Sequence, residues 1–246
     1  MTLSGPGQPL VMTDLPIPDP GAHDVCVQVL ACGVCRTDLH ILDGDLPVCP
    51  AGRVPGHEVV GRVVALGSHA TRFQVGDRVG IPWLGGTCGH CAYCPHGREN
   101  LCDVPVFTGY DRHGGFAQYT VADARFCFAL PDSYDDIHAA PLLCAGLIGY
   151  RAYVLSGVKG PMRLGLYGFG AAAHILCQIA VAKGQQVHAF VRPGDQQSQR
   201  FALRLGACWA GSSDVMPPQA LDAALIFAPD GALVPLALRA VRKGGV

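Results

Sequence analysis

The chain has 246 residues, half of them hydrophobic and 15% charged, and its formal net charge is -1. It can bury one large core or two modest ones, and it has no block of like charge for binding nucleic acid or an anionic membrane. Its apolar runs are short and broken by Pro or Gly, which argues against a transmembrane helix. The first residues lack the basic start and apolar run of a signal peptide, so we expect a cytoplasmic protein.

Residues 1–150 are rich in Gly and Pro and contain short β-like runs. Hydrophobic and polar residues alternate over 24–33 and 59–67, a Gly-Asp turn separates apolar runs in 73–83, and further strands are expected in 114–131. This pattern predicts a β-rich, barrel-like domain with long loops.

Residues 151–246 alternate between strand and helix patterns. An apolar strand at 163–167 leads into a Gly-rich turn and a helix at 168–184, where Ile175, Ile179 and Ala182 recur at helical spacing. The segments that follow are a strand at 185–191, a helix at 195–206, strands at 207–210 and 221–228, and a helix at 231–241. This alternation predicts a parallel sheet in a doubly wound α/β domain.

The last residues, "KGGV", have the pattern of the entrance to another strand. A dinucleotide-binding fold of six strands would be incomplete here. We therefore expect the C-terminal part of the second domain to be missing.

Twelve cysteines without a signal peptide are expected to be reduced, which makes metal binding their best general explanation. Two short gaps and one longer gap let a single loop wrap four thiolates around a tetrahedral structural zinc. An iron–sulfur cluster also uses four cysteines, but this spacing favours zinc. Four unconnected buried cysteines are disfavoured at this density, and His90 and His96 are assigned to the surface. The four ligands are Cys88, Cys91, Cys94 and Cys102.

Three more candidate ligands, Cys35, His57 and Cys144, lie far apart in sequence and each has glycine nearby. Two cysteines and one histidine with an open position form a known set of catalytic-zinc ligands. Spacing alone does not establish this set, because a lone His or Cys more often serves packing.

A nucleotide motif, G-x-G-x-x-A, is formed by Gly168, Gly170 and Ala173 between a strand and a helix. Such glycines let the backbone approach a pyrophosphate at the helix N-terminus. The acidic residue expected about 20 positions later is missing. Val191 stands near that place and Arg192 follows, which permits NADP, while Asp195 remains a possible ribose partner. The motif alone therefore indicates a dinucleotide, and the missing carboxylate leaves NAD and NADP both open.

Together these motifs resemble the zinc-dependent alcohol dehydrogenases of the medium-chain dehydrogenase/reductase superfamily. The resemblance covers essentially the whole chain and implies a GroES-like catalytic domain, a Rossmann domain, two zinc ions per chain and a nicotinamide cofactor. The motifs occur in family order: "CGVCRTDLH", "VPGHEVVGRVVALG", "VGDRVG", "CGHCAYC", "LLCAG" and "GFGAAAH".

The resemblance assigns roles around the second metal. Cys35, His57 and Cys144 are implied as the ligands of the catalytic zinc. Glu58 matches the family glutamate near the metal, and Asp38 matches the aspartate that orients the ligand histidine.

The resemblance also implies how a proton moves. Zinc would polarise the substrate oxygen, the substrate carbon would pass hydride to the nicotinamide, and the proton would leave through Thr37, the cofactor ribose and His40. Arg36 is either a contact to the cofactor phosphates or a solvated surface charge. Trp83 is expected to line the substrate pocket, whereas Tyr110 is equally well explained as a core aromatic.

The sequence thus predicts an oxidoreductase that interconverts alcohols and aldehydes or ketones as a homodimer or homotetramer. One alternative is another zinc-dependent dehydrogenase of polyol, formaldehyde or cinnamyl-alcohol type, and a second is an inactive truncated fragment. A zinc-ribbon module that binds nucleic acid or protein predicts a basic face and no nucleotide fold, and neither fits. In "CGVC", Cys35 is the expected ligand and Cys32 is expected to pack as a small hydrophobic residue.

Overall fold

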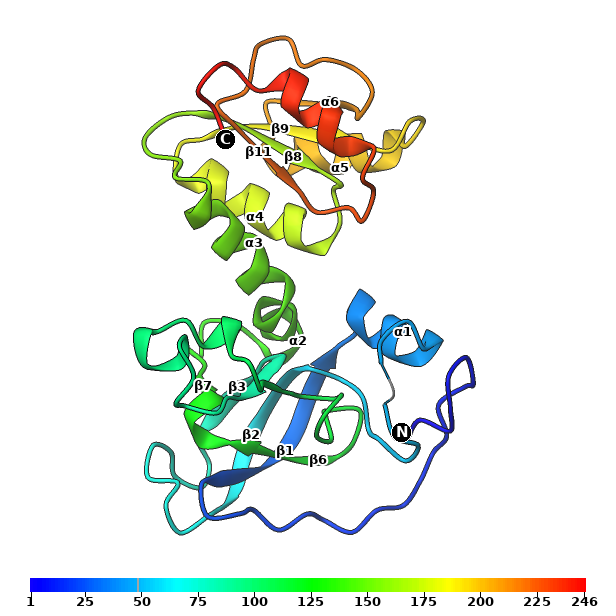
Figure 1. Ribbon diagram of the computed structural model, residues 1–246, viewed down its shortest axis with the longest axis vertical. Coiled ribbons are helices and arrows are strands. Elements are labelled where there is room, and N and C mark those ends of the chain that lie inside the picture. The colour runs from blue at the N-terminus through cyan, green and yellow to red at the C-terminus, as the bar shows by residue number, and fades with distance from the viewer. Residues whose placement is uncertain (48) are drawn as a thin grey trace. The chain divides into compact units, whose positions relative to one another are not determined.

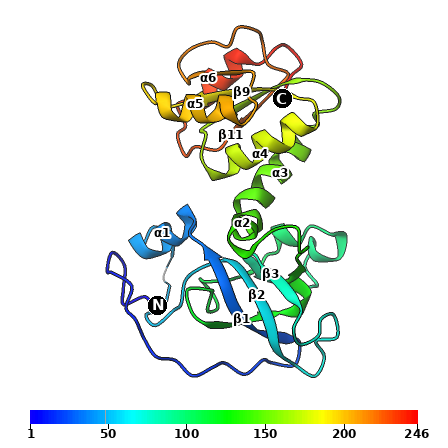
Figure 2. The same cartoon turned by 180° about the vertical axis from the view of Figure 1, so that it is seen from behind.

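The computed structural model describes residues 1–47 and 49–246, and these form two compact units, Met1–Cys144 and Ala145–Val246 (Figures 1 and 2). The second unit begins with helix α3 (Ala145–Leu155). Residue 150, where the sequence suggested a boundary, lies inside this helix.

The first unit is organised around a five-stranded antiparallel sheet with the order β6-β1-β2-β3-β7. Alternate β-branched side chains of its central strands, including Val25, Val27, Val59 and Val79, are fully buried and form its core. This confirms the predicted β-rich domain. The strands are β1 (Asp24–Gly33), β2 (Glu58–Leu66), β3 (Arg78–Ile81), β6 (Tyr119–Asp123) and β7 (Phe128–Ala129).

Long connections in this unit carry the candidate metal ligands. Helix α1 (Arg36–Asp43) follows β1 directly, and a two-stranded sheet of β4 (Leu84–Gly86) and β5 (Val106–Phe107) frames the cysteine-rich loop. Short helical turns complete the unit: η1 (Cys94–His96), η2 (Glu99–Leu101), η3 (Ala124–Phe126), α2 (Asp136–Ala139) and η4 (Ala140–Leu143).

The second unit has a four-stranded parallel sheet with the order β10-β9-β8-β11. Leu164 and Leu166 of β8 pack with α4, whereas Tyr167 on the opposite face packs with α6, so helices cover both faces. This confirms the doubly wound α/β fold. Its elements after α3 are β8 (Arg163–Tyr167), α4 (Ala171–Ala182), β9 (Gln186–Val191), α5 (Gln196–Arg204), β10 (Trp209–Ser212), β11 (Ala223–Ile226) and α6 (Leu233–Ala240).

Helix α4 forms where the sequence predicted it, but its buried face differs from the expected stripe. Ile175 and Ile179 are only half-buried, and Ala182 is exposed. Three of the four residues on the stripe that is buried instead have small side chains, which let the helix lie close to the sheet. The buried residues are Ala173, Leu176, Cys177 and Ala180.

The last residues lie beside β11, as their strand-like pattern suggested. The backbone N–H of Val246 donates to the Asp222 carbonyl at 3.2 Å, and the Ala224 N–H donates to the Val246 carbonyl at 2.8 Å.

Among the described residues, no single helix has the length and apolar character to cross a membrane. Only the broken pair Asp136–Leu143 and Ala145–Leu155 meets that test, when the two helices are taken together.

Candidate metal centres and cofactor site

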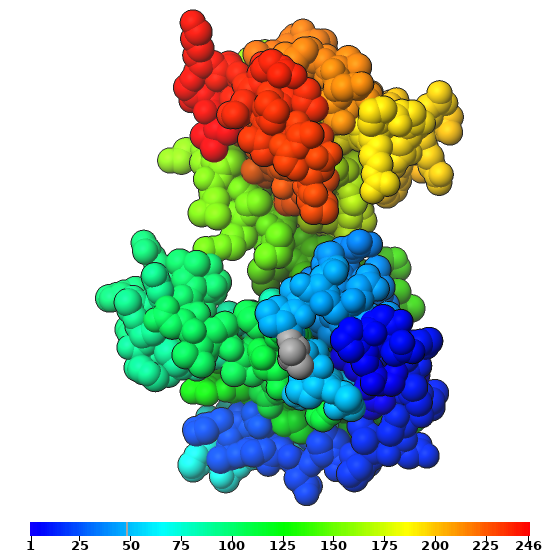
Figure 3. Space-filling view, turned by 45° about the vertical axis from the view of Figure 1, so that its right-hand side comes forward, coloured from blue at the N-terminus to red at the C-terminus, as the bar shows by residue number. Residues whose placement is uncertain are grey.

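The loop between β4 and β5 gathers four cysteine sulfurs, with one ligand atom from each lying within 4.8 Å of the others. The Cys91 and Cys94 sulfurs are 3.5 Å apart, and so are those of Cys88 and Cys102. Two sulfurs of a tetrahedral zinc lie about 3.8 Å apart, because each Zn–S bond is about 2.3 Å long. The spacing of the sulfurs therefore fits zinc. We call the loop that carries Cys88, Cys91, Cys94 and Cys102 the cysteine lobe, and Figure 3 shows it (bluish green) projecting from the first unit. His90 and His96 are exposed, as the sequence suggested.

Backbone N–H groups stabilise the thiolates of this loop. The Cys88 and Val104 amides donate to the Cys102 sulfur at 3.3 and 3.4 Å, and the Cys91 amide donates to Cys88 at 3.4 Å. The backbone amides of Asp103, Tyr93 and Cys94 lower the pKa of Cys91 to about 6, and backbone amides also lower the pKa of Cys102. Burial raises the pKa of Cys94 to about 11. The loop thus already favours a partly deprotonated state, which is the state a metal needs.

The second group joins three distant segments of the first unit. Cys35 precedes α1, His57 and Glu58 stand where β2 begins, and Cys144 follows η4. One ligand atom from each of the four residues lies within 4.8 Å of the others, and the Cys35 and Cys144 sulfurs are 3.8 Å apart. The structure therefore brings together the three residues that the resemblance implied as zinc ligands, and Glu58, which the resemblance placed near the metal, lies with them.

Asp38 braces this group from the third position of α1. Its Oδ1 contacts His57 Nδ1 at 2.9 Å and accepts the Gly56 N–H at 3.2 Å, while its Oδ2 accepts the Cys35 N–H at 2.8 Å. The His57 and Asp38 side chains are only 1% and 3% exposed. One carboxylate therefore orients two candidate ligands and caps the helix that carries one of them.

His57 supplies the sharpest test of whether a metal fits. Its Nδ1 faces Asp38, and its buried Nε2 has no hydrogen-bond partner among the described residues. A buried ring nitrogen without a partner is costly unless something else satisfies it. An ion held by this nitrogen and the sulfurs of Cys35 and Cys144 would do so, and the mixed nitrogen and sulfur donors are those that zinc prefers.

The protonation states of the group agree with this fit. A hydrogen bond from Cys144, and then the contact with His57, lower the pKa of Cys35 to about 3. The Cys35 thiolate in turn raises the pKa of Cys144, so one proton is shared by the sulfur pair. Burial alone lowers the pKa of His57, but Asp38 and Cys35 outweigh it and raise this pKa to about 9. A cation that replaced the protons would satisfy the same negative groups.

Aromatic side chains close one side of this group. The Trp83 ring meets the His57 ring edge-on, with centroids 5.1 Å apart, and stacks on Phe107 at 4.7 Å. The Tyr110 ring lies 6.1 Å from Trp83. Trp83 therefore lies beside the candidate metal, where it can exclude water, and Tyr110 belongs to the same aromatic cluster.

Three polar residues of α1 were also assigned roles from the sequence. The Thr37 hydroxyl lies 3.9 Å from the Cys35 sulfur, next to the metal group. His40 lies in the last turn of the helix and its Nδ1 contacts Asp45 at 2.7 Å, a partner that the sequence did not suggest. Arg36 is exposed at the first position of the helix.

The G-x-G-x-x-A motif forms the turn between β8 and α4. Gly168 has a φ of 83°, and an added Cβ would lie 2.8 Å from the Ala228 side chain. Gly170 is the N-cap residue of α4, and a Cβ added there would meet no described atom within 4 Å. Ala173 is fully buried against the sheet. The turn borders a cavity of about 530 Å³ at the carboxyl ends of β8, β9 and β11, which is where doubly wound sheets bind nucleotides.

The end of β9 offers no carboxylate to a ribose. Val191 is buried at this end, and Arg192 lines the cavity. Asp195 lines the same cavity, but it caps α5: it accepts the Ser198 N–H at 2.9 Å and the Ser198 hydroxyl at 2.7 Å. The hydrogen bonds from Ser198 lower the pKa of Asp195, so the ionised carboxylate stabilises the N-terminus of α5. Asp195 is therefore a weaker candidate for a ribose partner than the sequence suggested.

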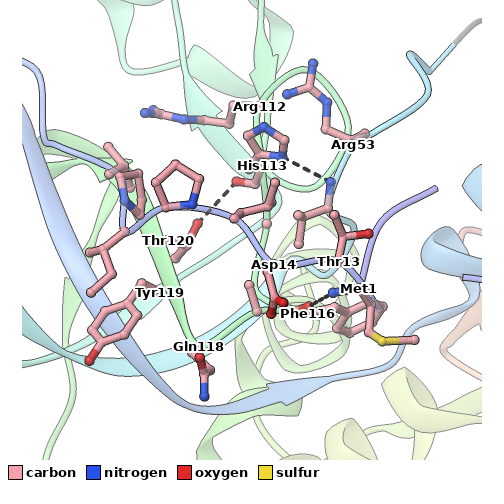
Figure 4. A pocket seen from close by; sticks show the side chains of 18 of the residues that line it. Met1, Thr13, Asp14, Arg53, Arg112, His113, Phe116, Gln118, Tyr119 and Thr120 are labelled. Carbon is pink, nitrogen blue, oxygen red and sulfur yellow. Dashed lines mark hydrogen bonds between the residues drawn. The ribbon is translucent and has the colours of Figure 1, made fainter. Parts of the chain in front are cut away.

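A further cavity, of about 880 Å³, was not marked by any sequence motif (Figure 4). It lies between the extended segment 12–18 and the segment 111–121, and none of the candidate site residues lines it. Arg53, Arg112 and His113 lie at one end, and the Met1 amine donates to the Phe116 carbonyl at 2.7 Å. Burial and the charge of Arg53 lower the pKa of His113.

Comparisons with known proteins agree with this geometry. Residues 21–132 match the family described as "Alcohol dehydrogenase GroES-like domain". Over 97% of its length the chain is 47% identical to "Probable alcohol dehydrogenase AdhA" of Mycobacterium tuberculosis, of which it covers 70%.

Solved structures also resemble the chain in fold. The acetophenone reductase of Geotrichum candidum, in complex with NAD, has a TM-score of 0.85 and 30% identity over 99% of this chain and 72% of its own. CAD from Helicobacter pylori, complexed with NADP(H), has a TM-score of 0.85 and 26% identity over 92% of this chain and 67% of its own. The chain belongs to the zinc-containing medium-chain alcohol dehydrogenase family.

Proposed function

We propose that this chain interconverts alcohols and aldehydes or ketones by hydride transfer to and from NAD(P). The observation that carries the proposal is the buried Nε2 of His57, which has no hydrogen-bond partner in the part of the chain that the structure describes and lies beside two sulfurs at zinc spacing, in a member of this family. Cys35, His57 and Cys144 are the proposed ligands of the catalytic zinc, with Glu58 beside them. The four-cysteine lobe is the proposed structural zinc site.

The residues around these two groups have different proposed roles. When bound, zinc polarises the substrate oxygen and the nicotinamide carries the hydride. Asp38 keeps His57 oriented toward the metal, and Trp83 shields that side from water. Thr37 is the proposed acceptor of the substrate hydroxyl proton, since its hydroxyl lies beside Cys35. His40, at the other end of α1, is the proposed exit of that proton to solvent.

The experiment is a panel of simple, polyol and cinnamyl alcohols and their carbonyl partners, with NAD and NADP, alongside metal analysis. We expect two zinc ions per chain, one for each group, and alcohol-dependent reduction of NAD or NADP. The alcohol that reacts fastest separates the simple, polyol and cinnamyl alternatives. A purified chain with two zinc ions but no turnover of any substrate would contradict the proposal.

The cofactor proposed within this class is NADP. Its support is the missing carboxylate at Val191, the guanidinium of Arg192 at the cavity, and the engagement of Asp195 in capping α5. An Arg192→Ala change should therefore lower kcat/KM with NADP by roughly 10- to 100-fold and leave the value with NAD unchanged, since a charged hydrogen-bonded contact to a phosphate contributes roughly 1.5–3 kcal/mol.

Arg200→Ala is the matched control, because it removes the same charge from the exposed side of α5. The ratio of catalytic efficiencies with the two cofactors decides the matter. An Arg192→Ala ratio equal to that of wild type would remove Arg192 from cofactor selection.

The remaining assignments concern substrate, assembly and location. The substrate proposed is a small alcohol or aldehyde, and the assembly proposed is a homodimer or homotetramer, which the family resemblance implies. The twelve cysteines are all free, and both thiolate groups require a reducing setting. This supports the cytoplasm as the proposed location.

A further inference from the structure

Helix α1 ends in a turn that folds the chain back on itself. Gly44 adopts a φ of 80°, in the left-handed region that terminates helices. Its N–H donates to the Ile41 carbonyl at 3.3 Å, and the next N–H, of Asp45, donates to the His40 carbonyl at 3.0 Å. The sequence "HILDGD" therefore returns Asp45 to the residue five positions before it.

This turn places two side chains in direct contact. His40 Nδ1 lies 2.7 Å from Asp45 Oδ2, while the two side chains are 36% and 57% exposed. An ionised carboxylate carries no proton, so Nδ1 must donate one. A neutral imidazole has a single N–H, and Nε2 is then left with a free lone pair.

We propose that Asp45 is a positioning residue that holds His40 in the tautomer whose Nε2 can take up a proton. The proposal rests on the proposed function, in which His40 releases the substrate proton to solvent. His40 Nε2 accepts one proton and becomes imidazolium while Nδ1–H stays on Asp45, and loss of the same proton to water restores the neutral ring. No electron is transferred in this cycle.

The first unit already uses the same device elsewhere. Asp38 Oδ1 faces His57 Nδ1 at 2.9 Å and leaves Nε2 toward the candidate metal. Helix α1 thus carries one carboxylate–imidazole contact near each end. The contact at Asp38 is buried and suits a fixed metal ligand, while the contact at Asp45 is open to water and suits proton exchange.

Nitrogen NMR of the His40 ring in the zinc-loaded chain without cofactor tests the proposal directly. At alkaline pH, where the ring is neutral, the wild type should show a protonated Nδ1 and an unprotonated Nε2. Asp45→Ala should lose this preference, whereas Asp45→Asn should retain much of it, because its amide oxygen can still accept from Nδ1. Asp43→Asn removes an exposed carboxylate from the same turn and should change nothing.

A double-mutant cycle adds a kinetic readout. Asp45→Ala should lower kcat by about tenfold with KM little changed, since general acid–base assistance supplies roughly 100-fold or more in total. In a His40→Ala background the same change should have no further effect. Added imidazole should restore part of the rate in both single variants.

Two results would overturn the positioning role: a wild-type ring protonated at Nε2, or a ring state that Asp45→Ala leaves unaltered. Equal kinetic losses from Asp45→Ala with and without His40 would also overturn it. If the wild type oxidised no alcohol, the proposed function would fail, and the NMR measurement would still decide the tautomer.

Discussion

The two metal groups of the first unit solve the same problem in different ways. The cysteine lobe takes its four ligands from one loop, Cys88 to Cys102, and stabilises their thiolates with backbone N–H groups. The second group joins Cys35 to Cys144, 109 positions away, and is braced by a buried side chain, Asp38. A loop can close on an ion by itself, whereas the second group exists only after the sheet has formed. The two groups should therefore fail independently.

Cys144→Ser should have the largest effect on activity. It removes one proposed ligand of the catalytic zinc, and loss of even an outer partner of a metal site costs 10–100-fold, so we expect a fall in kcat/KM of more than about 100-fold. Metal analysis should find one zinc per chain, held by the lobe.

Cys208→Ser is the control, since Cys208 is an exposed cysteine outside both groups. It should keep both zinc ions and full activity. A Cys144→Ser chain that still held both would remove Cys144 from the ligand set.

Cys102→Ser should instead weaken the lobe and spare the second group. The Cys102 sulfur accepts the amides of Cys88 and Val104, so its loss removes a ligand and two hydrogen bonds that order the loop. We expect one zinc per chain, early protease cleavage within residues 88–102, and a retained catalytic zinc. Limited proteolysis with metal analysis measures both. Loss of both zinc ions together would show that the two groups are coupled.

The contrast between these groups also explains what the sequence could predict. The lobe is visible from spacing alone, because its ligands are neighbours on one loop. The second ligand set could be predicted only from the family resemblance, because only the folded sheet brings together Cys35, His57 and Cys144. The sheet of the second unit follows from its alternating pattern, but the buried stripe of α4 does not, since small alanines pack more closely than the isoleucines.

Other features depended on local geometry that the residue pattern only partly encodes. Asp195 precedes Ser198 by three positions, a spacing typical of a helix cap, so its role could have been recognised. The contact between His40 and Asp45 depends on the left-handed turn at Gly44 and on two exposed side chains, and no motif marked it. The cavity along segment 12–18 is built from distant segments without chemical motifs.

Cys32→Ala should have the smallest effect, although Cys32 and Cys35 form a C-x-x-C pair. The Cys32 sulfur lies outside the group of four ligands and packs so closely on Gly56 and Gly115 that a Cβ on either would lie 2.9 Å from it. Burial raises the pKa of Cys32 to about 12, which agrees with a neutral thiol that packs as a small hydrophobic residue. We expect a loss of about 1 kcal/mol in stability, a fall in Tm of about 2–4 °C, two retained zinc ions and nearly full activity. Cys35→Ala, made three residues away, should lose one zinc and most activity. Equal loss of zinc from both variants would show that the two cysteines act as a metal-binding pair after all.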